Sequence, residues 1–270
     1  MARRSRLAVL GGHGFIARHV AAALPADDVL VLPHPVAREG ALPPDVSAVL
    51  WGGRHPTLGT PAWRLDDEPE LHAARLAAAR GLPFLTLGTR KVYAPKRDPF
   101  REDDPTGPVD RYGEQKLAIE QALLDVSGDC LLTRLRLSNV FGHEPGRPTF
   151  VGRMVTTLAA DGEIRFDMNP FTRRDFIPAE FAGHAIAALL RAPPGGIVNV
   201  GSGIALECGR LALWLIEGRG AGRLVCASPD ERDAFALDVG RMRDLTGVVV
   251  DERAIRAACL AVGRDAGRRG

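Results

Sequence analysis

Apolar and polar positions along the first 200 residues follow two alternating patterns. Longer segments with apolar residues at helical spacing occur at residues 14–24, 68–80, 112–126, 150–160 and 179–191. Short apolar runs, typical of buried parallel strands, occur at residues 7–10, 29–32, 48–51, 84–87, 130–135 and 197–200. Strands that alternate with helices predict a parallel sheet covered by helices. We therefore expect an α/β fold with a doubly wound parallel sheet.

Two proline-rich segments interrupt this alternation. Residues 33–45, PHPVAREGALPPD, leave room for one crossover but hardly for a helix, a further strand and a return. The sheet is therefore expected to be short on that side. Residues 94–110 are also rich in proline and charge, and we expect this loop to arch over a site.

The C-terminal third has shorter and less regular patterns, which predict a small lobe against the edge of the sheet. We expect residues 1–165 to form the sheet domain, with residues 179–200 returning to it. Residues 166–178 and 201–270 are then expected to form the lobe that binds the substrate.

Composition limits the classes of partner. The 270 residues are 46% hydrophobic and 25% charged, which is ordinary for a globular protein. The net charge is +2, and no long block of one sign predicts a nucleic-acid partner. No apolar window approaches the roughly 20 residues of a membrane span, and the N-terminal apolar run is too short for an export signal. A soluble protein is expected.

The four cysteines are widely spaced and form no CxxC pair. They are Cys130, Cys208, Cys226 and Cys259. Neither a metal site nor a disulfide framework is predicted, and reduced thiols are typical of a cytoplasmic protein.

The segment LAVLGGHGFIARHV, residues 7–20, has the order strand, glycine turn, helix. Gly11 and Gly14 are three positions apart, and Ala17 follows after three more. Small residues there let backbone N–H groups at the helix N-terminus approach a diphosphate. A plain structural turn is the alternative, but the place directly after the first strand favours dinucleotide binding.

The end of the second predicted strand lacks the acid that usually contacts the ribose hydroxyls of NAD. Pro33, His34 and Pro35 stand there instead. Without that carboxylate the 2′-phosphate of NADP is not repelled, and Arg38 or His34 could pair with it. This favours NADP over NAD, although Arg38 is equally well explained as a solvated loop residue.

A tyrosine and a lysine lie four positions apart in RYGEQK, residues 111–116. On a helix, Tyr112 and Lys116 share one face. A neighbouring ammonium favours the ionised form of a phenol, and such a pair can move a proton at a carbonyl or carbinol oxygen. Thr89, just past the fourth apolar run, offers a second donor at the carboxyl end of a strand, where ligands bind in such sheets. A YxxxK pair alone also occurs by chance.

Six segments in order resemble an extended short-chain dehydrogenase/reductase of the NAD-dependent epimerase/dehydratase type. GGHGFIA is similar to the family's TGxxGFIG turn, GTRKVYA to its S-S/T-x-x-VYG segment and DRYGEQKLAIEQ to its YGxSK helix. RLSNVFG resembles RxxNVYG, RRDFIPAEFA resembles RDFVYVDDVA, and NVGSG matches directly. The likeness covers roughly residues 6–200 and implies a Rossmann-type fold, from which the proline-rich segment 33–45 departs by shortening the adenine side.

The resemblance implies a role for each matching residue. Tyr112 would be the acid/base, Lys116 its activator and a ligand of the nicotinamide ribose, and Thr89 a donor to the substrate oxygen. Lys91, Asn139 and Arg174 would bind the substrate, the last two at its diphosphate. The residues expected to contact the cofactor are Gly11, His13, Gly14, Phe15, Ile16, Arg38, Gly52, Leu87, Tyr112 and Lys116.

Departures from the family pattern limit the reactions that the protein is expected to catalyse. The Asp and Glu that follow the threonine in nucleotide-sugar 4,6-dehydratases are here Arg90 and Lys91, which argues against dehydration. Reduction of a 4-keto nucleotide sugar with exchangeable NADP is expected, and an epimerase with retained NAD is the alternative. A dinucleotide-sensing regulator without catalysis is a third reading, disfavoured because Tyr112 and Lys116 are both present. The family also implies a homodimer that pairs through the tyrosine-bearing helix.

Overall fold

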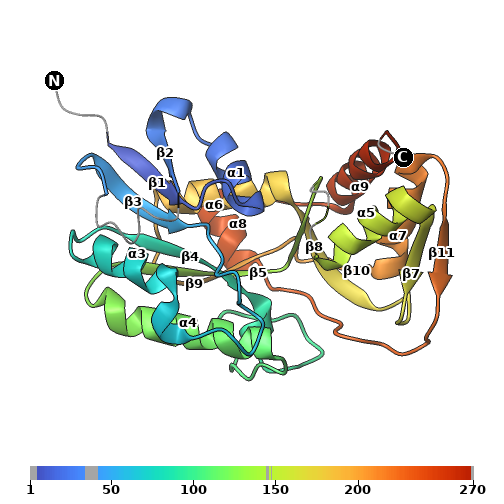
Figure 1. Cartoon of the computed structure of the whole chain (residues 1–270), viewed down its shortest axis with the longest axis horizontal. Helices are drawn as coiled ribbons and strands as arrows, with labels where there is room; N and C mark the ends of the chain where they lie inside the picture. Colours follow the sequence, from blue (N-terminus) through green and yellow to red (C-terminus); the bar gives the residue numbers. More distant parts are fainter. Residues whose placement is uncertain (1–4, 34–41, 144–145, 147, 269–270) are drawn as a thin grey trace.

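The computed structural model describes residues 5–33, 42–143, 146 and 148–268. Its main sheet has six parallel strands in the order β2-β1-β3-β4-β5-β9, which confirms the expected fold class (Figure 1). Within the described part of the chain, β2 stands at one edge of this sheet, as a short side would require. The strands are β1 (Arg6–Leu10), β2 (Val29–Leu32), β3 (Val46–Trp51), β4 (Phe84–Thr89), β5 (Leu132–Leu137) and β9 (Gly196–Val200).

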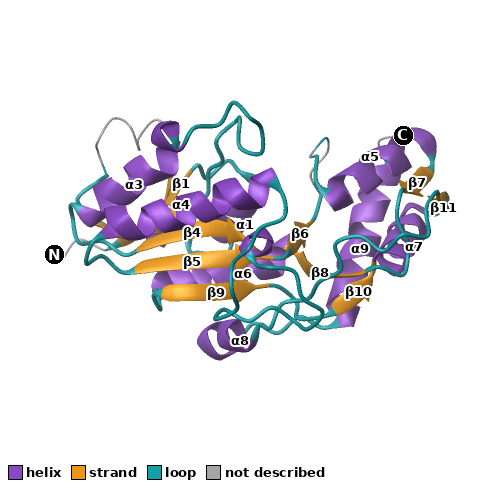
Figure 2. Ribbon diagram, turned by 90° about the horizontal axis from the view of Figure 1, so that it is seen from below, coloured by secondary structure: helices purple, strands orange, loops and turns teal. Residues whose placement is uncertain are grey.

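Helices cover both faces of this sheet, which explains why β1 and β3 are almost continuously apolar. α1 (Phe15–Ala22) and α6 (Ala179–Arg191) lie on one face, and α3 (Pro69–Ala78) and α4 (Arg111–Ser127) lie on the other (Figure 2). Gly183 allows the close approach of α6 to α1, because a Cβ atom there would lie 2.6 Å from the carbonyl oxygen of His19.

The predicted start of the fifth strand was wrong by two residues. α4 continues to Ser127, and the N–H of Cys130 donates to the Ser127 carbonyl in the turn that follows the helix. Cys130 therefore belongs to the turn, and β5 begins at Leu132.

The C-terminal lobe is built from longer elements than the sequence pattern suggested. α7 (Cys208–Arg219) and α9 (Glu252–Gly267) pack closely, because a Cβ at Gly263 would lie only 2.2 Å from the Leu215 carbonyl oxygen. Two small sheets complete this part of the chain, one in the order β10-β8-β6 and one of β11 and β7. Their strands are β6 (Asn139–Phe141), β7 (Glu163–Phe166), β8 (Arg173–Pro178), β10 (Ala205–Glu207) and β11 (Arg223–Cys226).

Two helices pack against elements outside the part of the molecule to which we expected them to belong. α5 (Phe150–Asp161) packs against β7 and α9, whereas α8 (Gly240–Thr246) packs against α6 and β9 (Figure 1). We therefore propose to assign α5 to the lobe and α8 to the sheet domain. The expected boundary near residue 165 then moves to the start of α5.

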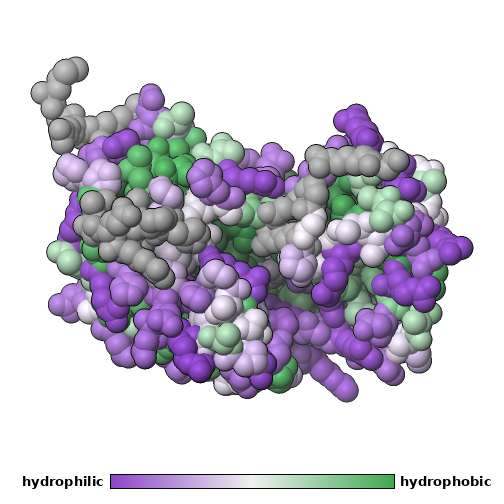
Figure 3. All heavy atoms as spheres, viewed as in Figure 1, coloured by the Kyte–Doolittle hydropathy of each residue, from purple (hydrophilic) through white to green (hydrophobic). Residues whose placement is uncertain are grey.

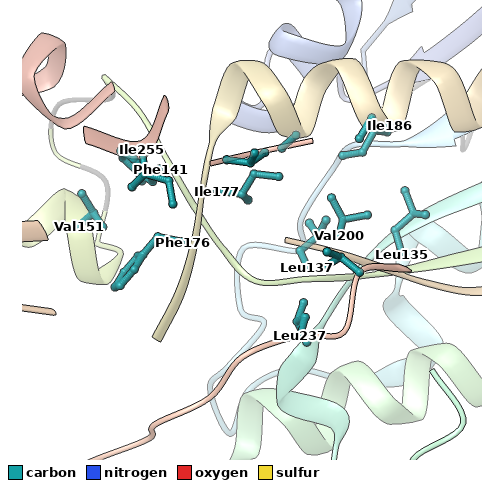
Figure 4. Close-up of a cluster of buried hydrophobic side chains, with 14 of the residues drawn as sticks. Leu135, Leu137, Phe141, Val151, Phe176, Ile177, Ile186, Val200, Leu237 and Ile255 are labelled. Atoms are coloured by element: carbon teal, nitrogen blue, oxygen red, sulfur yellow. The ribbon is translucent and has the colours of Figure 1, made fainter. Parts of the chain in front are cut away.

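One apolar core runs from the sheet into the lobe. Leu135 and Val200 lie beneath α6, while Phe176 and Val151 continue the cluster toward α5 (Figure 4). A second core, on the other face of the sheet, holds Trp51. This continuity fixes the lobe relative to the sheet, and the surface is hollowed between them (Figure 3).

A segment called here the strap, residues 227–239, returns from β11 to α8 across this junction. Phe100 of the loop 94–110 donates to the Ala236 carbonyl at 2.9 Å and accepts from the N–H of Asp238 at 2.8 Å. Backbone hydrogen bonds therefore join the strap to the loop 94–110. Among the residues that the structure describes, no helix is long and apolar enough to cross a membrane.

Candidate active site

The strand order reverses between β1 and β3, and ligands of doubly wound sheets bind outside the carboxyl ends of such strands. The glycine turn after β1 lies at this position. Gly11 has a φ of +72°, which favours glycine, and its N–H donates to the Leu32 carbonyl at 2.8 Å. Gly14 donates to the Gly11 carbonyl at 2.9 Å and precedes α1.

The turn has the shape that a diphosphate needs. A Cβ at Gly14 would lie 3.0 Å from the carbonyl oxygen of Gly52, and one at Gly52 would lie 2.6 Å from the Cβ of Ala17. Backbone from β1, α1 and β3 thus meets where only small residues fit. Gly14 is the N-cap of α1 and, as a glycine, provides no side-chain cap. These residues fit a dinucleotide phosphate.

The other predicted cofactor residues have different environments. His13 is exposed beside the turn, Ile16 is half-buried, and Phe15 is 6% exposed with its ring edge-on to His19. Phe15 therefore packs in the core rather than presenting an open ring. Arg38 lies outside the described residues.

The first turn of α4 presents Tyr112. The Asp110 carboxylate caps the helix by accepting from the Gly113 N–H at 2.8 Å. A Cβ at Gly113 would lie 2.5 Å from the Lys91 carbonyl oxygen, so glycine lets α4 start directly against the 3₁₀ turn Arg90–Val92. That turn follows Thr89, so the tyrosine-bearing helix begins beside the threonine-bearing strand.

Lys116 connects this helix to the sheet. Its side chain is buried, and Nζ donates to the Leu87 carbonyl at 3.0 Å and lies 3.5 Å from a carboxylate oxygen of Glu70. Burial opposes the charge, but Glu70 first, and then Tyr112, favour it, so that the pKa of Lys116 is raised. The ammonium is thus fixed beside the strand that ends at Thr89.

Thr89 is oriented by its own backbone turn. It is 9% exposed, and its hydroxyl oxygen accepts from the Lys91 N–H at 3.3 Å. A hydroxyl has one hydrogen to donate, and this contact leaves that hydrogen available to a substrate oxygen.

The loop after β3 contributes contacts that sequence patterns did not indicate. The guanidinium of Arg54 lies 5.6 Å from the centre of the Tyr112 ring. Gln115 accepts from the Gly59 N–H at 2.6 Å and donates to the Thr60 carbonyl at 2.8 Å. These bonds hold the loop against the start of α4.

A cavity of about 520 Å³ lies next to these groups. Arg90 forms an ion pair with Asp233 of the strap, and its guanidinium lies 3.7 Å from the centre of the Phe235 ring. Lys91 forms an ion pair with Asp110. The cavity is lined by Arg90, Lys91, Tyr93, Pro95, Lys96, Phe100, Val109, Asp110, Glu231, Asp233 and Ala234. The loop 94–110 therefore lines a cavity together with the strap.

The two residues predicted to bind a diphosphate lie in the lobe-side sheet. Asn139 begins β6, and its buried Nδ2 has no hydrogen-bond partner among the described residues. Arg174 is 8% exposed and donates to the carbonyls of Arg232 at 2.7 Å and Asp233 at 3.1 Å. Arg174 thus holds the strap, and its contact with a diphosphate remains a prediction.

A buried polar network lies beside the cavity and includes Tyr93, which lines it. The hydroxyl of Tyr93 donates to Asn199 at 2.7 Å, and burial raises the pKa of Tyr93 to about 12. The Arg136 guanidinium lies 4.5 Å from the centre of the Tyr93 ring and pairs with Glu120 at 2.8 Å. Across the described part of the chain, no group of three or more His, Cys, Asp or Glu residues could hold a metal ion.

Comparisons with known proteins agree with this geometry. The model of the NAD dependent epimerase/dehydratase family matches residues 70–201. A dTDP-6-deoxy-L-talose 4-dehydrogenase (NAD(P)(+)) from Kitasatospora kifunensis is 32% identical over 289 aligned positions, which cover 90% of each chain.

Two solved structures share the fold at low identity. One is UDP-N-acetylglucosamine 4-epimerase from Methanobrevibacter ruminantium M1 in complex with UDP-N-acetylmuramic acid, with a TM-score of 0.82, 18% identity and 97% of each chain covered. The other is RMD from Pseudomonas aeruginosa complexed with NADPH, with a TM-score of 0.80, 22% identity and coverage of 98% of this chain and 100% of that one.

Proposed function

Because the chain belongs to the NAD dependent epimerase/dehydratase family, we propose that it is an NAD(P)-dependent oxidoreductase that reduces the 4-keto group of a nucleotide-linked sugar. The observation that carries this proposal is the bond from Lys116 to the Leu87 carbonyl. It joins the helix that bears Tyr112 to the strand that ends at Thr89, so that a proton donor and a hydroxyl donor can face one substrate oxygen.

The proposed reaction uses each of these groups once. A bound NADPH would supply the hydride. The hydroxyl of Thr89 would donate to the carbonyl oxygen of the sugar, and Tyr112 would give its proton to that oxygen as negative charge develops on it. The ammonium of Lys116 would stabilise the phenolate that remains. The diphosphate of the cofactor would lie on the glycine turn, at Gly11, Gly14 and Gly52.

Dehydration is disfavoured by the side chains beside Thr89. Arg90 pairs with Asp233, and Lys91 pairs with Asp110. Neither is a carboxylate that could remove or deliver the proton of a water elimination. Arg90 and Lys91 instead line the cavity in which we expect the sugar. Asn139 and Arg174 remain our candidates for binding the diphosphate of the nucleotide sugar.

An epimerase with retained NAD is the second candidate, because it would use the same three groups. The relative from Kitasatospora kifunensis is a dehydrogenase that is named for NAD(P)(+), which favours exchangeable cofactor and net reduction. A dinucleotide-sensing regulator is disfavoured, since a sensor without catalysis has no use for a proton donor such as Tyr112.

Turnover on a panel of nucleotide sugars distinguishes these candidates. After separate titrations with NADPH and NADH, the protein is incubated with 4-keto and 4-hydroxy sugars linked to dTDP or UDP. We expect NADPH to be consumed in proportion to the 4-keto sugar reduced. Interconversion of 4-hydroxy sugars without net consumption would instead identify an epimerase, and binding without any turnover would identify a sensor.

A homodimer in the cytoplasm is also proposed. On α4, Ile119 and Leu123 are buried, but Leu124 is 50% exposed and Leu117 is half-buried. An apolar outer face of this helix suits pairing with a second copy. The four cysteines are all free thiols, which suits a reducing compartment.

A further inference from the structure

Glu70 is a buried carboxylate that neither the sequence motifs nor the proposed reaction uses. It is the second residue of α3 and is 1% exposed. Its carboxylate accepts from the hydroxyl of Thr86 on β4 and lies 3.5 Å from the ammonium of Lys116. A buried charge is costly unless it is paired and hydrogen-bonded. The partner of Glu70 is therefore the lysine of the candidate active site.

The charged and titratable groups around this pair come from three segments. Lys116 and Tyr112 lie on α4, and the Arg54 guanidinium stands near the Tyr112 ring. Glu68 caps α3 by accepting from the Glu70 N–H at 3.4 Å, and its other carboxylate oxygen accepts from the indole of Trp63 at 2.9 Å. Glu68 is thus committed to the helix start, which leaves Glu70 as the carboxylate in ion-pair contact with the ammonium.

The charges of the pair depend on one another. Burial raises the pKa of Glu70, and Lys116 opposes that rise. Glu70 is the strongest influence that favours the charged form of Lys116 against burial. An ammonium has three hydrogens, and two directions are taken by the Leu87 carbonyl and Glu70. The remaining hydrogen can serve a cofactor hydroxyl, which the proposed role of Lys116 requires.

We propose that Glu70 is a positioning residue that fixes the ammonium of Lys116 and keeps it charged beside Tyr112. This inference rests on the proposed function, in which Tyr112 is the proton donor. A carboxylate 3.5 Å from the ammonium stabilises the charge of Lys116 in its buried site. Glu70 thereby keeps the ammonium charged and in place beside Tyr112 without touching the substrate.

The Glu70→Gln variant tests this role through two pH titrations. One is kcat/KM against pH, and the other is the near-ultraviolet absorbance of tyrosinate in the protein without substrate. The chain has two tyrosines, and Tyr112→Phe identifies the transition that belongs to Tyr112. In Glu70→Gln we expect both midpoints to move to higher pH by about one unit, because Lys116 loses the counter-ion that favours its charge and then stabilises the phenolate less.

Two further variants make the result decisive. Glu70→Asp keeps the negative charge but moves it away from the ammonium, and we expect a smaller shift of both midpoints in the same direction. This variant also tests the proposal if Glu70→Gln does not fold. Glu114→Gln removes an exposed charge from the first turn of α4, and we expect no shift because water screens that charge.

A purely structural role for Glu70 would give a different result. Turnover would then fall by one factor at every pH, and the tyrosinate midpoint would stay at the wild-type value, which would overturn the inference. The absorbance titration needs no substrate. Failure to turn over any nucleotide sugar would therefore contradict the proposed function, while the tyrosinate shift would still decide the role of Glu70.

Discussion

Tyr112→Phe is expected to lower kcat by a factor of about 10² or more while NADPH affinity stays within about twofold of wild type. The substitution removes only the hydroxyl that gives the proton. The ring can keep its place between α4 and the loop after β3, where Arg54 stands over it. The reacting oxygen of the sugar would then retain the Thr89 donor but lose its acid.

Steady-state kinetics and a separate cofactor titration check this expectation. A fall in kcat with unchanged NADPH affinity fits loss of the acid, since binding of the dinucleotide depends on the glycine turn. If turnover survived in Tyr112→Phe, the acid would have been assigned to the wrong residue. Loss of NADPH binding in a folded variant would mean that Tyr112 holds the cofactor rather than acting on the substrate.

Glu120→Gln is expected to cost about 3–5 kcal/mol of unfolding free energy, because it leaves Arg136 buried without its counter-ion. Arg136 and Glu120 are each 2% exposed and pair at 2.8 Å. Burial opposes the charge of Arg136, but Glu120 first, and then Tyr93, favour it, and the pKa of Arg136 is raised. An arginine stays protonated in proteins, so in the variant Arg136 cannot avoid the loss by giving up its proton.

Urea unfolding of Glu120→Gln and Glu217→Gln measures this difference. Glu217 pairs with Arg256 at 2.6 Å, but both side chains are about half exposed, so the control is expected to lose less than about 1 kcal/mol. Equal losses in the two variants would contradict the supporting role of the network below Tyr93. Retained NADPH binding in the folded Glu120→Gln protein would show that the ion pair stabilises the fold but is not needed for cofactor binding.

The parts of this protein that local patterns predict are those in which chain neighbours are also neighbours in space. The glycine turn lies between adjacent elements, so the spacing of Gly11, Gly14 and Ala17 already describes its shape. Tyr112 and Lys116 are one helical turn apart, and the sequence therefore predicted their common face. Each of these predictions needed only one helix, or one strand and the helix that follows it.

Features that depend on distant segments were not predicted. Glu70 looks like an ordinary acid in the first turn of a helix, and only the packing of α3 beside α4 brings it to Lys116. Asp233, with a φ of +57°, meets Arg90 because the strap crosses the junction. No periodicity marks such contacts. The same reason explains why α5 was expected in the sheet domain, since its apolar face does not say which element it covers.

Isotope transfer tests the central proposal most directly. The protein is incubated with a dTDP-linked 4-keto sugar and NADPH that carries deuterium at the transferable position of its nicotinamide. We predict that the product sugar gains one deuterium at C4 and that oxidised cofactor is released in equal amount. A sugar that changes configuration without gaining deuterium, while NADPH remains intact, would contradict the proposed reductase.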